Sequence, residues 1–298
     1  MSAAATSWIL SEGFAGLQAQ ALGLAEAAGL QPELRVLVPR APWKWLAASL
    51  WPAPLAAVGD AVRAPVPGLV IGSGGVAAAV GAALRGGGRS VVQVQHPRMD
   101  PRRFDLVVVN RHDELTGPNV VVTRTALHRV TPARLAEAAQ QWCPHFEHLK
   151  RPLVAVLVGG SNGRFRLDAS VGGALAGQLA AMMRCDGVGV AVTPSRRTDP
   201  AVTRVLTEAL APLGGYVWDG SGANPYFGML ALADAIVVTM DSVSMVSEAV
   251  ATAAPVMLAA LPGRSRRNRL FTDVLLAEGR VREFAGRYEV WPDRKSVV

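Results

Sequence analysis

The stretch 153-LVAVLVGGSNGR-164 decides the fold of this chain. Its first six residues, Leu153–Val158, are all apolar, and a loop with three glycines follows. A strand that is apolar on both faces belongs to a parallel sheet covered by helices on each side. A glycine loop directly after such a strand lets the backbone turn into a helix and approach a ligand closely. The stretch therefore predicts the first strand and loop of an α/β domain.

The same alternation of short apolar runs with Ala- and Leu-rich runs extends in both directions. Strands are expected at 35–38, 68–71, 90–95, 106–109 and 120–123 before this stretch, and at 187–193, 216–218, 235–238 and 255–258 after it. Helices are expected at 18–28, 75–85, 133–139, 171–184, 200–211 and 244–253. Strands that alternate with helices favour parallel sheets with helices on both faces, so we predict an α/β fold.

The alternation pauses once, between Gln140 and Pro152. This segment contains two prolines and residues of mixed polarity, which is typical of a linker between domains. A length of 298 residues also suits two domains. We predict an N-terminal domain over 1–143, a linker over 144–152 and a second domain over 153–279. Residues 280–298 are expected to pack back on the N-terminal domain.

The composition excludes several classes of protein. The chain carries 30 Lys and Arg against 23 Asp and Glu, a net charge of +7 that both halves share. No basic domain results, and we expect no binding to nucleic acid. Two cysteines exclude a disulfide scaffold and a Cys-rich zinc module. The spacing of the histidines fits no metal site, so we expect neither a metal nor a tightly bound cofactor.

The sequence predicts a cytoplasmic protein. The apolar residues 1–10 lack the preceding Lys or Arg of a signal peptide, and the apolar run 43–51 is too short to span a bilayer. That run does combine three tryptophans with a lysine, as membrane interfaces often do: Trp43, Trp45, Trp51 and Lys44. Two interpretations stay open, a peripheral contact with the inner membrane and packing of the tryptophans inside the first domain.

Polar residues in the second half gather after the expected strands. In open α/β sheets, ligands bind beyond the carboxyl ends of the strands, where helix N-termini point. Adjacent arginines beside hydroxyl groups suit a diphosphate, and a tyrosine ring suits a purine or pyrimidine. Ordinary turns and capped helix starts are the competing interpretation. The candidates are Gly159, Gly160, Ser161 and Asn162; Ser195, Arg196 and Arg197; Asn224 and Tyr226; and Thr239, Asp241, Ser242, Ser244 and Glu248.

The segment 238–248 carries the strongest indication of a site. A strand ends before Asp241, and Ser242 or Ser244 then caps a helix that carries Glu248. Ser244 and Glu248 are four residues apart and share one helical face. The helix N-terminus suits a phosphate, and the carboxylate suits ribose hydroxyl groups. A helix cap needs one polar residue, whereas this segment supplies several.

The first half has polar strand ends of its own. His96 follows one expected strand, and His112 and Asp113 follow the next. A histidine with a carboxylate partner can act as a general base, although a histidine at a strand end is often structural. Glycine-containing loops open two helices near the other strands, with Gly13, Gly16 and Gln20 in one and Gly72, Ser73 and Gly74 in the other.

Together these segments resemble a known family, the bacterial and plant proteins named for the plant mitochondrial-fission factor of elongated-mitochondria mutants. The family has also carried the label nucleoside-diphosphate-sugar epimerase-like. The most specific segments are 104-FDLVVV-109, 117-GPNV-120 and 241-DSVSMVSEA-249. One departure is Gly75, where many relatives have an arginine. The matching segments run along nearly the whole chain: 12–24, 71–74, 93–98, 104–128, 158–161, 195–198 and 224–248.

The resemblance implies a GT-B-like fold, with two Rossmann-like domains facing across a cleft. It also implies that the N-terminal domain, with its two glycine loops, takes an acceptor. The C-terminal domain would hold a nucleotide-sugar donor. The positions that would match the donor site are Gly159, Gly160, Ser161, Arg196, Asp241, Ser242 and Glu248.

We therefore expect a metal-independent glycosyltransferase that uses a nucleotide sugar. The adjacent arginines and the helix at Ser242 would stabilise the leaving diphosphate. His96 or His112, with Asp113, would deprotonate an acceptor hydroxyl, and a lipid-linked acceptor would account for the tryptophans. Two alternatives stay open. One is a non-catalytic binding or scaffold protein connected with membrane or organelle division, and the other is a nucleotide-sugar epimerase of the GT-B fold.

Overall fold

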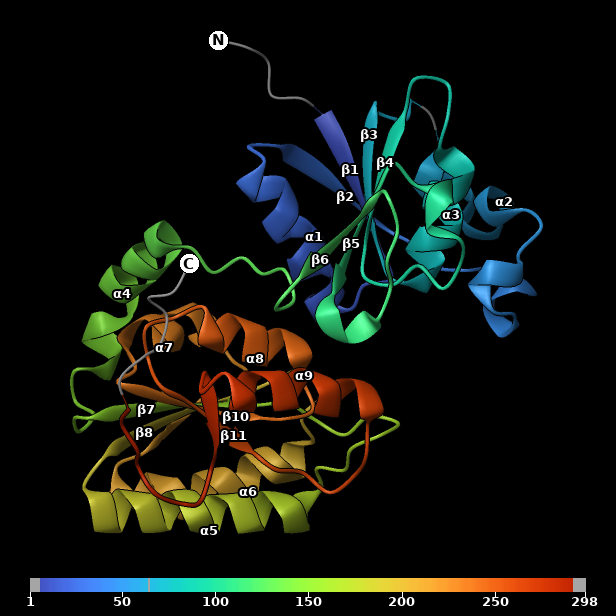
Figure 1. Cartoon of the computed structure of the whole chain (residues 1–298). Helices are drawn as coiled ribbons and strands as arrows, with labels where there is room; N and C mark the ends of the chain where they lie inside the picture. Colours follow the sequence, from blue (N-terminus) through green and yellow to red (C-terminus); the bar gives the residue numbers. More distant parts are fainter. Residues whose placement is uncertain (1–5, 64, 292–298) are drawn as a thin grey trace. The chain divides into compact units, whose positions relative to one another are not determined.

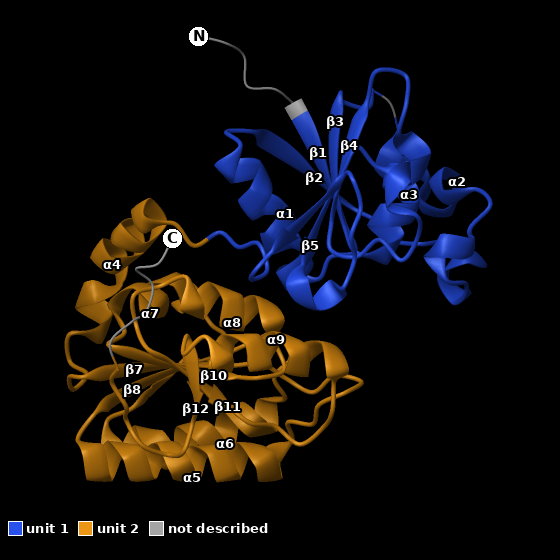
Figure 2. Cartoon of the chain, in the orientation of Figure 1, with its two compact units in different colours: residues 1–129 blue, residues 130–298 orange. Residues whose placement is uncertain are grey.

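The computed structural model describes residues 6–63 and 65–291. The chain divides into two compact units, residues 1–129 (unit 1) and 130–298 (unit 2), which Figure 2 distinguishes by colour. Over the described residues, each unit is a six-stranded parallel sheet with helices on both faces (Figure 1). The prediction of an α/β chain with two Rossmann-like domains is confirmed.

The sheet of unit 1 has the strand order β2-β1-β3-β4-β5-β6. Its strands are β1 Thr6–Ser11, β2 Gln31–Val36, β3 Leu69–Ser73, β4 Ser90–Val94, β5 Leu106–Asn110 and β6 Val120–Thr123. The parallel register pairs Gly72 with Gln93 and Val94 with Val108. The residues that follow β3, β4 and β5 therefore emerge next to one another at the carboxyl edge of the sheet.

The two faces of this sheet are covered by different helices. The helices are α1 Ala15–Ala27, α2 Pro54–Val58 and α3 Gly75–Leu84, with short 3-10 turns η1 Trp43–Trp45, η2 Ala48–Leu50, η3 Gly59–Val62, η4 Pro101–Arg103 and η5 Arg111–Asp113. Ile9 of β1 shares a buried cluster with Ala21 and Ala25 of α1. Trp8 and Leu10 point to the other face and join the larger cluster beneath α2 and α3.

The sheet of unit 2 has the strand order β12-β11-β10-β7-β8-β9. Its strands are β7 Leu153–Val158, β8 Gly189–Pro194, β9 Tyr216–Val217, β10 Ala235–Thr239, β11 Val256–Ala259 and β12 Val281–Glu283. All six residues of β7 are buried, as its unbroken apolar run predicts. Because β7 lies between β10 and β8, the residues after these three strands meet at one edge.

Alternate residues of β7 contact opposite layers of helices. Val154, Val156 and Val158 belong to the core under α5 and α6, whereas Leu153 and Leu157 belong to the core on the other face. The helices of unit 2 are α4 Pro132–Phe146, α5 Ala169–Asp186, α6 Pro200–Leu210, α7 Tyr226–Leu232, α8 Val243–Val250 and α9 Arg266–Ala277, with the 3-10 turn η6 Ala211–Leu213.

The unit boundary differs from the predicted linker at 144–152. The units divide after Arg129, and the first part of the expected linker is the end of α4, with Pro144 inside that helix. Ala138, Trp142 and Phe146 recur every four residues along α4 and are buried, and the two aromatic residues belong to the core of unit 2. This apolar stripe packs the helix on unit 2. The burial of these residues therefore decides that the segment is a helix, although Pro144 suggested a linker.

The end of the chain also differs from the prediction that 280–298 packs on the N-terminal domain. Strand β12 pairs in parallel with β11, and Phe284 and Trp291 are buried in the core under α5. The segment up to Trp291 therefore completes unit 2. Residues 292–298 lie outside the described part of the chain. Within that described part, we find no helix with the length and apolarity needed to cross a bilayer.

Candidate functional site

The candidate site of unit 2 is built around the carboxylate of Asp241. Its side chain is fully buried just beyond β10. Oδ2 accepts the backbone N–H of Gly160 at 3.1 Å and a guanidinium hydrogen from Arg197 at 2.9 Å. Oδ1 accepts the hydroxyl of Thr239 at 2.7 Å, and that hydroxyl accepts the N–H of Gly159 at 2.7 Å. Asp241 thus joins the loops that follow β7, β8 and β10.

The two glycines after β7 are required by close packing. A Cβ atom on Gly159 would overlap the carboxylate of Asp241, and one on Gly160 would overlap the backbone of Arg197. The N–H groups of both glycines are engaged by Thr239 and Asp241 rather than directed at solvent. The glycine loop was expected to let the backbone approach a ligand, whereas here its first two N–H groups hold the strand ends together.

Ser161 and Asn162 shape the rest of this loop. The hydroxyl of Ser161 donates to the carbonyl of Leu167 at 3.1 Å and accepts the Leu167 N–H at 2.8 Å. Oδ1 of Asn162 accepts the N–H groups of Arg164 at 2.9 Å and Phe165 at 3.0 Å. In this conformation, both side chains serve the turn.

The loop after β8 presents two arginines in different ways. Arg197 donates from Nη1 to the carbonyl of Gly160 at 3.1 Å as well as to Asp241, and its side chain is 43% exposed. Arg196 is exposed and lines a pocket. Ser195 and Thr198 fold the loop, since the Ser195 N–H donates to the Thr198 hydroxyl at 2.8 Å. Thr198, which sequence reasoning missed as a site residue, also donates to the carbonyl of Gly159.

The pocket beside Arg196 has a volume of about 530 Å³. It lies between α6 and the residues that follow β8 and β9. Trp218 contributes an aromatic wall directly after β9 and is half-buried. Sequence reasoning missed Trp218 as a site residue, although a tryptophan at the carboxyl end of a strand was an available signal. The other lining residues include hydroxyls and charges of both signs: Ser195, Thr198, Thr203, Arg204, Thr207, Glu208 and Asp219.

Helix α8 begins at the same edge of the sheet. Ser242 is its N-cap and accepts the N–H of Met245 at 3.4 Å, and Ser244 lies in the first turn. The buried amide of Asn268 on α9 holds the approach to this helix by donating to the carbonyls of Met240 at 3.1 Å and Asp241 at 3.2 Å. Asn268 is not among the predicted site residues, because it lies in a run of arginines without an apolar pattern.

Glu248 forms a second polar group with Tyr226. Glu248 is buried on α8 and accepts the phenol hydrogen of Tyr226, the first residue of α7. Burial, and then the neighbouring Glu248 charge and hydrogen bond, raise the pKa of Tyr226 well above the usual tyrosine value. Oδ1 of Asn224 accepts the Tyr226 N–H at 2.9 Å, two residues before α7 begins. The pair joins α7 to α8.

In unit 1, the two candidate histidines have different surroundings. His96 is half-buried, and its Nδ1 accepts the N–H of Arg98 at 2.9 Å. A neutral imidazole that accepts at Nδ1 carries its proton on Nε2. The imidazole of His112 is 2% exposed, with Nε2 3.9 Å from the Asp113 carboxylate. Asp113 also accepts the N–H of Asn110 and closes the turn after β5.

The glycine loops of unit 1 meet at the N-terminus of α3. Glu12 accepts the N–H of Val76 at 3.0 Å, and Gly74, at φ 104°, leaves room for the Glu12 carboxylate. The side chain of Gln93 packs against Gly72 and donates to the carbonyl of Gly74 at 3.2 Å. The remaining predicted acceptor-side residues lie close by along the chain: Gly13 at φ 84° after β1, Gly16 and buried Gln20 on α1, and buried Ser73.

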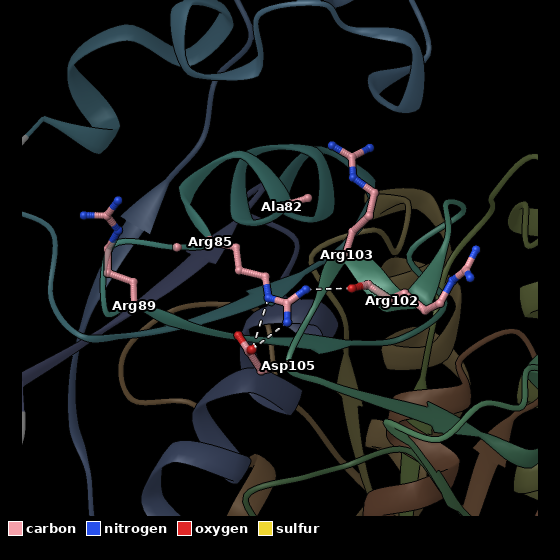
Figure 3. A pocket seen from close by; sticks show the side chains of 7 residues that line it. Ala82, Arg85, Arg89, Arg102, Arg103 and Asp105 are labelled. Atoms are coloured by element: carbon pink, nitrogen blue, oxygen red, sulfur yellow. Dashed lines mark hydrogen bonds and ion pairs between the residues drawn. The ribbon is translucent and has the colours of Figure 1, made fainter.

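An arginine-lined pocket of about 650 Å³ lies at the opposite, amino end of the unit 1 sheet (Figure 3). Arg85 is turned toward Asp105, to which it donates from Nε at 3.1 Å. The guanidinium groups of Arg89, Arg102 and Arg103 point in different directions (Figure 3). Arg89 donates to the carbonyl of Leu84 at 2.8 Å and so satisfies the end of α3. Arg102 pairs with Asp100, the N-cap of η4, so Arg85, Arg89 and Arg102 stabilise the turns around the pocket.

The side chains that could hold a metal ion are scattered over residues 6–63 and 65–291. In these ranges, no group of three or more His, Cys, Asp or Glu side chains is arranged to hold a metal ion. The polar groups at the carboxyl edge of unit 2 are therefore hydroxyls, arginines, a helix N-terminus and single carboxylates.

The sequence matches the family described as "Mitochondrial fission ELM1" over residues 15–295. The mitochondrial fission protein ELM1 of Arabidopsis thaliana is 35% identical over 220 residues, which cover 66% of this chain and 51% of that protein. The chain spans about half the length of the curated relatives that it matches.

Solved structures with the same fold include GT-B glycosyltransferases and UDP-GlcNAc 2-epimerases. Os79 from O. sativa, solved in complex with UDP, matches with a TM-score of 0.55 at 11% identity and covers 93% of this chain and 86% of Os79. MurG from Acinetobacter baumannii matches with a TM-score of 0.53 at 16% identity and covers 94% of this chain and 84% of MurG. At these identities the likeness concerns the fold alone.

Proposed function

The chain belongs to the mitochondrial fission ELM1 family and has a GT-B-like fold, and from this premise we propose that unit 2 binds a nucleotide sugar. The proposed reaction is transfer of the glycosyl group to an acceptor held by unit 1. The observation that carries this proposal is the pocket beside Arg196, at the carboxyl edge where β8 and β9 end. Ligands of open α/β sheets bind at that edge.

The pocket offers the chemistry that a nucleoside diphosphate needs. The ring of Trp218 suits stacking on a nucleobase, and Arg196 suits a phosphate. Arg197 donates one hydrogen bond to Gly160 and one to Asp241. A guanidinium group has five N–H donors, so the others can still donate to a phosphate. The N-terminus of α8 at Ser242 adds a positive dipole end. The UDP bound by Os79, a protein of the same fold, supports this choice of ligand class.

Glu248 is the proposed ribose ligand. Its carboxylate accepts the phenol hydrogen of Tyr226, which orients it, and a carboxylate has capacity for further hydrogen bonds. Ribose hydroxyl groups would donate to it. Tyr226 then acts as a positioning residue for Glu248.

The acceptor side of the proposal rests on unit 1. His96 is more exposed than His112, so we propose that His96 contacts the acceptor hydroxyl. With its proton on Nε2, His96 can donate a hydrogen bond from that nitrogen. Nδ1 can accept a proton only after it gives up its hydrogen bond from the Arg98 N–H. His112 and Asp113 would support the turn after β5.

The first experiment is a thermal-shift panel of nucleoside diphosphates and nucleotide sugars. A ligand at a hundredfold excess over its Kd stabilises the folded state by about 2.7 kcal/mol, which is measurable as a higher unfolding temperature. Arg196→Gln should abolish most of that shift. Arg184→Gln, which removes an exposed arginine from the last turn of α5, is the matched control and should keep it.

The family name supports a second candidate, a binding or scaffold protein that keeps the nucleotide site without transfer. The two candidates differ in turnover. An active enzyme releases free nucleoside diphosphate from the donor when an acceptor or water is present, whereas a binding protein shows the thermal shift without any release. No shift with any nucleotide would contradict both.

A further inference from the structure

The segment between β2 and α2 exposes an unusual amount of apolar side chain. Trp45 and Leu50 are each 72% exposed, Leu46 is 51% exposed, and Leu55 at the start of α2 is 38% exposed. These four residues lie within eleven positions of the chain. In Figure 1 the segment and α2 lie beyond α3, on the side of α3 that faces away from the sheet of unit 1.

Two other tryptophans hold this segment in place. Trp51 is buried in the core under α3, and Trp43 packs against the same core. Their ring centroids are 6.3 Å apart, and the indole N–H of Trp51 donates to the carbonyl of Leu46 at 3.2 Å. Of the three tryptophans that the sequence analysis grouped together, two are therefore anchors. Trp45 is the one presented to solvent, on the 3-10 turn η1 that Trp43 begins.

The charge around the segment is positive. No Asp or Glu occurs between residues 41 and 59. The ammonium group of Lys44 lies 5.1 Å from the ring centroid of Trp45. Arg40 and Arg63 flank the segment and share a single carboxylate, Asp60, at 3.6 Å and 3.5 Å. Three cations against one anion give residues 40–63, which contain the exposed side chains, a net positive charge.

We propose that the segment 43–55 docks unit 1 on the surface of an anionic lipid bilayer. Trp45, Leu46 and Leu50 would enter the boundary between headgroups and acyl chains, and Lys44, Arg40 and Arg63 would meet the lipid phosphates. Tryptophan beside a cation is suited to that boundary, since one end of the pair is apolar and the other stays hydrated. The positive surroundings give the charge complementarity that an anionic bilayer requires. This inference is independent of the proposed nucleotide site.

The test is co-sedimentation with vesicles of phosphatidylcholine alone and of phosphatidylcholine with about 30% phosphatidylglycerol. The full chain should bind the anionic vesicles, and more weakly as salt is raised, because screening weakens the contact of cations with phosphates. Trp45→Ser combined with Leu50→Ser should lower the partition coefficient at least about tenfold, since both side chains would leave the acyl boundary. Lys44→Gln should lower it about threefold, within the range for one cation near an anionic surface.

The matched control is Val121→Thr with Val122→Thr. These valines are about half exposed on β6 of the same unit, so the variant loses exposed apolar surface elsewhere and should bind vesicles like the unchanged chain. A second measurement is quenching by brominated lipid of the Trp45 emission, taken as the difference between the unchanged chain and Trp45→Phe.

Three outcomes would overturn the proposal. The first is no binding of the full chain to anionic vesicles. The second is equal binding by the Trp45→Ser, Leu50→Ser variant. The third is a larger sedimentation coefficient for the unchanged chain than for that variant, which would show that the segment is a contact between copies of the chain.

Discussion

At the scale of residues, the carboxylate of Asp241 joins three loops of unit 2. Sequence patterns identify a polar residue at a strand end, but they do not distinguish a carboxylate that faces a ligand from one that joins loops. Here the buried carboxylate receives hydrogen bonds from Gly160, Thr239 and Arg197. The donors come from three separate segments, so this arrangement depends on strand order and could not be read from local spacing.

Replacement of Asp241 by alanine should therefore destabilise unit 2. The change leaves a buried N–H and hydroxyl without their acceptor and removes the partner of Arg197. We expect a loss of roughly 2–4 kcal/mol in the free energy of unfolding, measured by urea denaturation. Asp241→Asn keeps the shape and should cost less. A change below about 0.5 kcal/mol in Asp241→Ala would contradict the structural role.

Because of Tyr226, we expect the free energy of unfolding to depend on pH in the alkaline range. Its pKa is raised in the folded chain by burial and by Glu248, whereas tyrosine in the unfolded chain ionises near pH 10. Above that pH the unfolded state loses a proton that the folded state keeps, so the stability due to Tyr226 is present below pH 10 and is lost as pH rises. Tyr226→Phe should lessen the decline in unfolding free energy between about pH 9 and 11.

Tyr216 and Tyr288 supply the internal control for this measurement. Burial also raises the pKa of both residues, and both stay in the variant. Part of the alkaline decline should therefore remain in Tyr226→Phe. An unchanged pH profile would show that Tyr226 ionises equally in the folded and unfolded chains.

At the scale of elements, the sequence predicts the apolar strands best. Residues 120–123 and 153–158 have the expected bounds, because each contains an unbroken run of apolar residues. Only β7 is fully buried, as such a run predicts, whereas Val121 and Val122 of β6 are about half exposed. Strands β1 and β12 and helices α2, α7 and α9 lie outside the expected ranges. The β12 residues are mostly exposed, and the buried face of α9 includes Asn268 and Thr272 beside Phe271 and Leu275, so neither has a purely apolar pattern.

The packing of α7 on α4 gives a sharp test of this element arrangement. A Cβ atom on Gly228 would overlap the side chain of Trp142, which is itself buried. Gly228→Ala should cost about 1–3 kcal/mol of unfolding free energy through overpacking. Gly177→Ala is the matched control, since nothing lies within 4 Å of its Cβ position on α5, and alanine there should stabilise by about 0.5–1 kcal/mol.

Both variants are measured by chemical denaturation. If Gly228→Ala is as stable as the unchanged chain, then α4 does not pack on α7 as described. The boundary between the units would then lie closer to the linker that two prolines at 144 and 152 predicted from the sequence alone.

At the scale of the whole molecule, the sequence predicts two Rossmann-like units, and the boundary between them requires tertiary contacts. The alternation of strands and helices establishes the fold class. The assignment of α4 to unit 2 follows from the burial of Trp142 and Phe146, which depends on which surfaces meet. The strand-end segments of the candidate site could also be identified from the sequence. The pocket could not, because Trp218 comes beside the loop after β8 only through the pairing of β8 with β9.

The most direct test of the account is calorimetric titration of the full chain with UDP and with UDP-linked sugars. The account predicts saturable binding, weakened at least about tenfold by Arg196→Gln, which corresponds to about 1.4 kcal/mol, and weakened also by Trp218→Ala, with Arg184→Gln unchanged. Absence of binding, or equal affinity in Arg196→Gln, Trp218→Ala and the unchanged chain, would contradict the claim that the carboxyl edge of unit 2 is a nucleotide site.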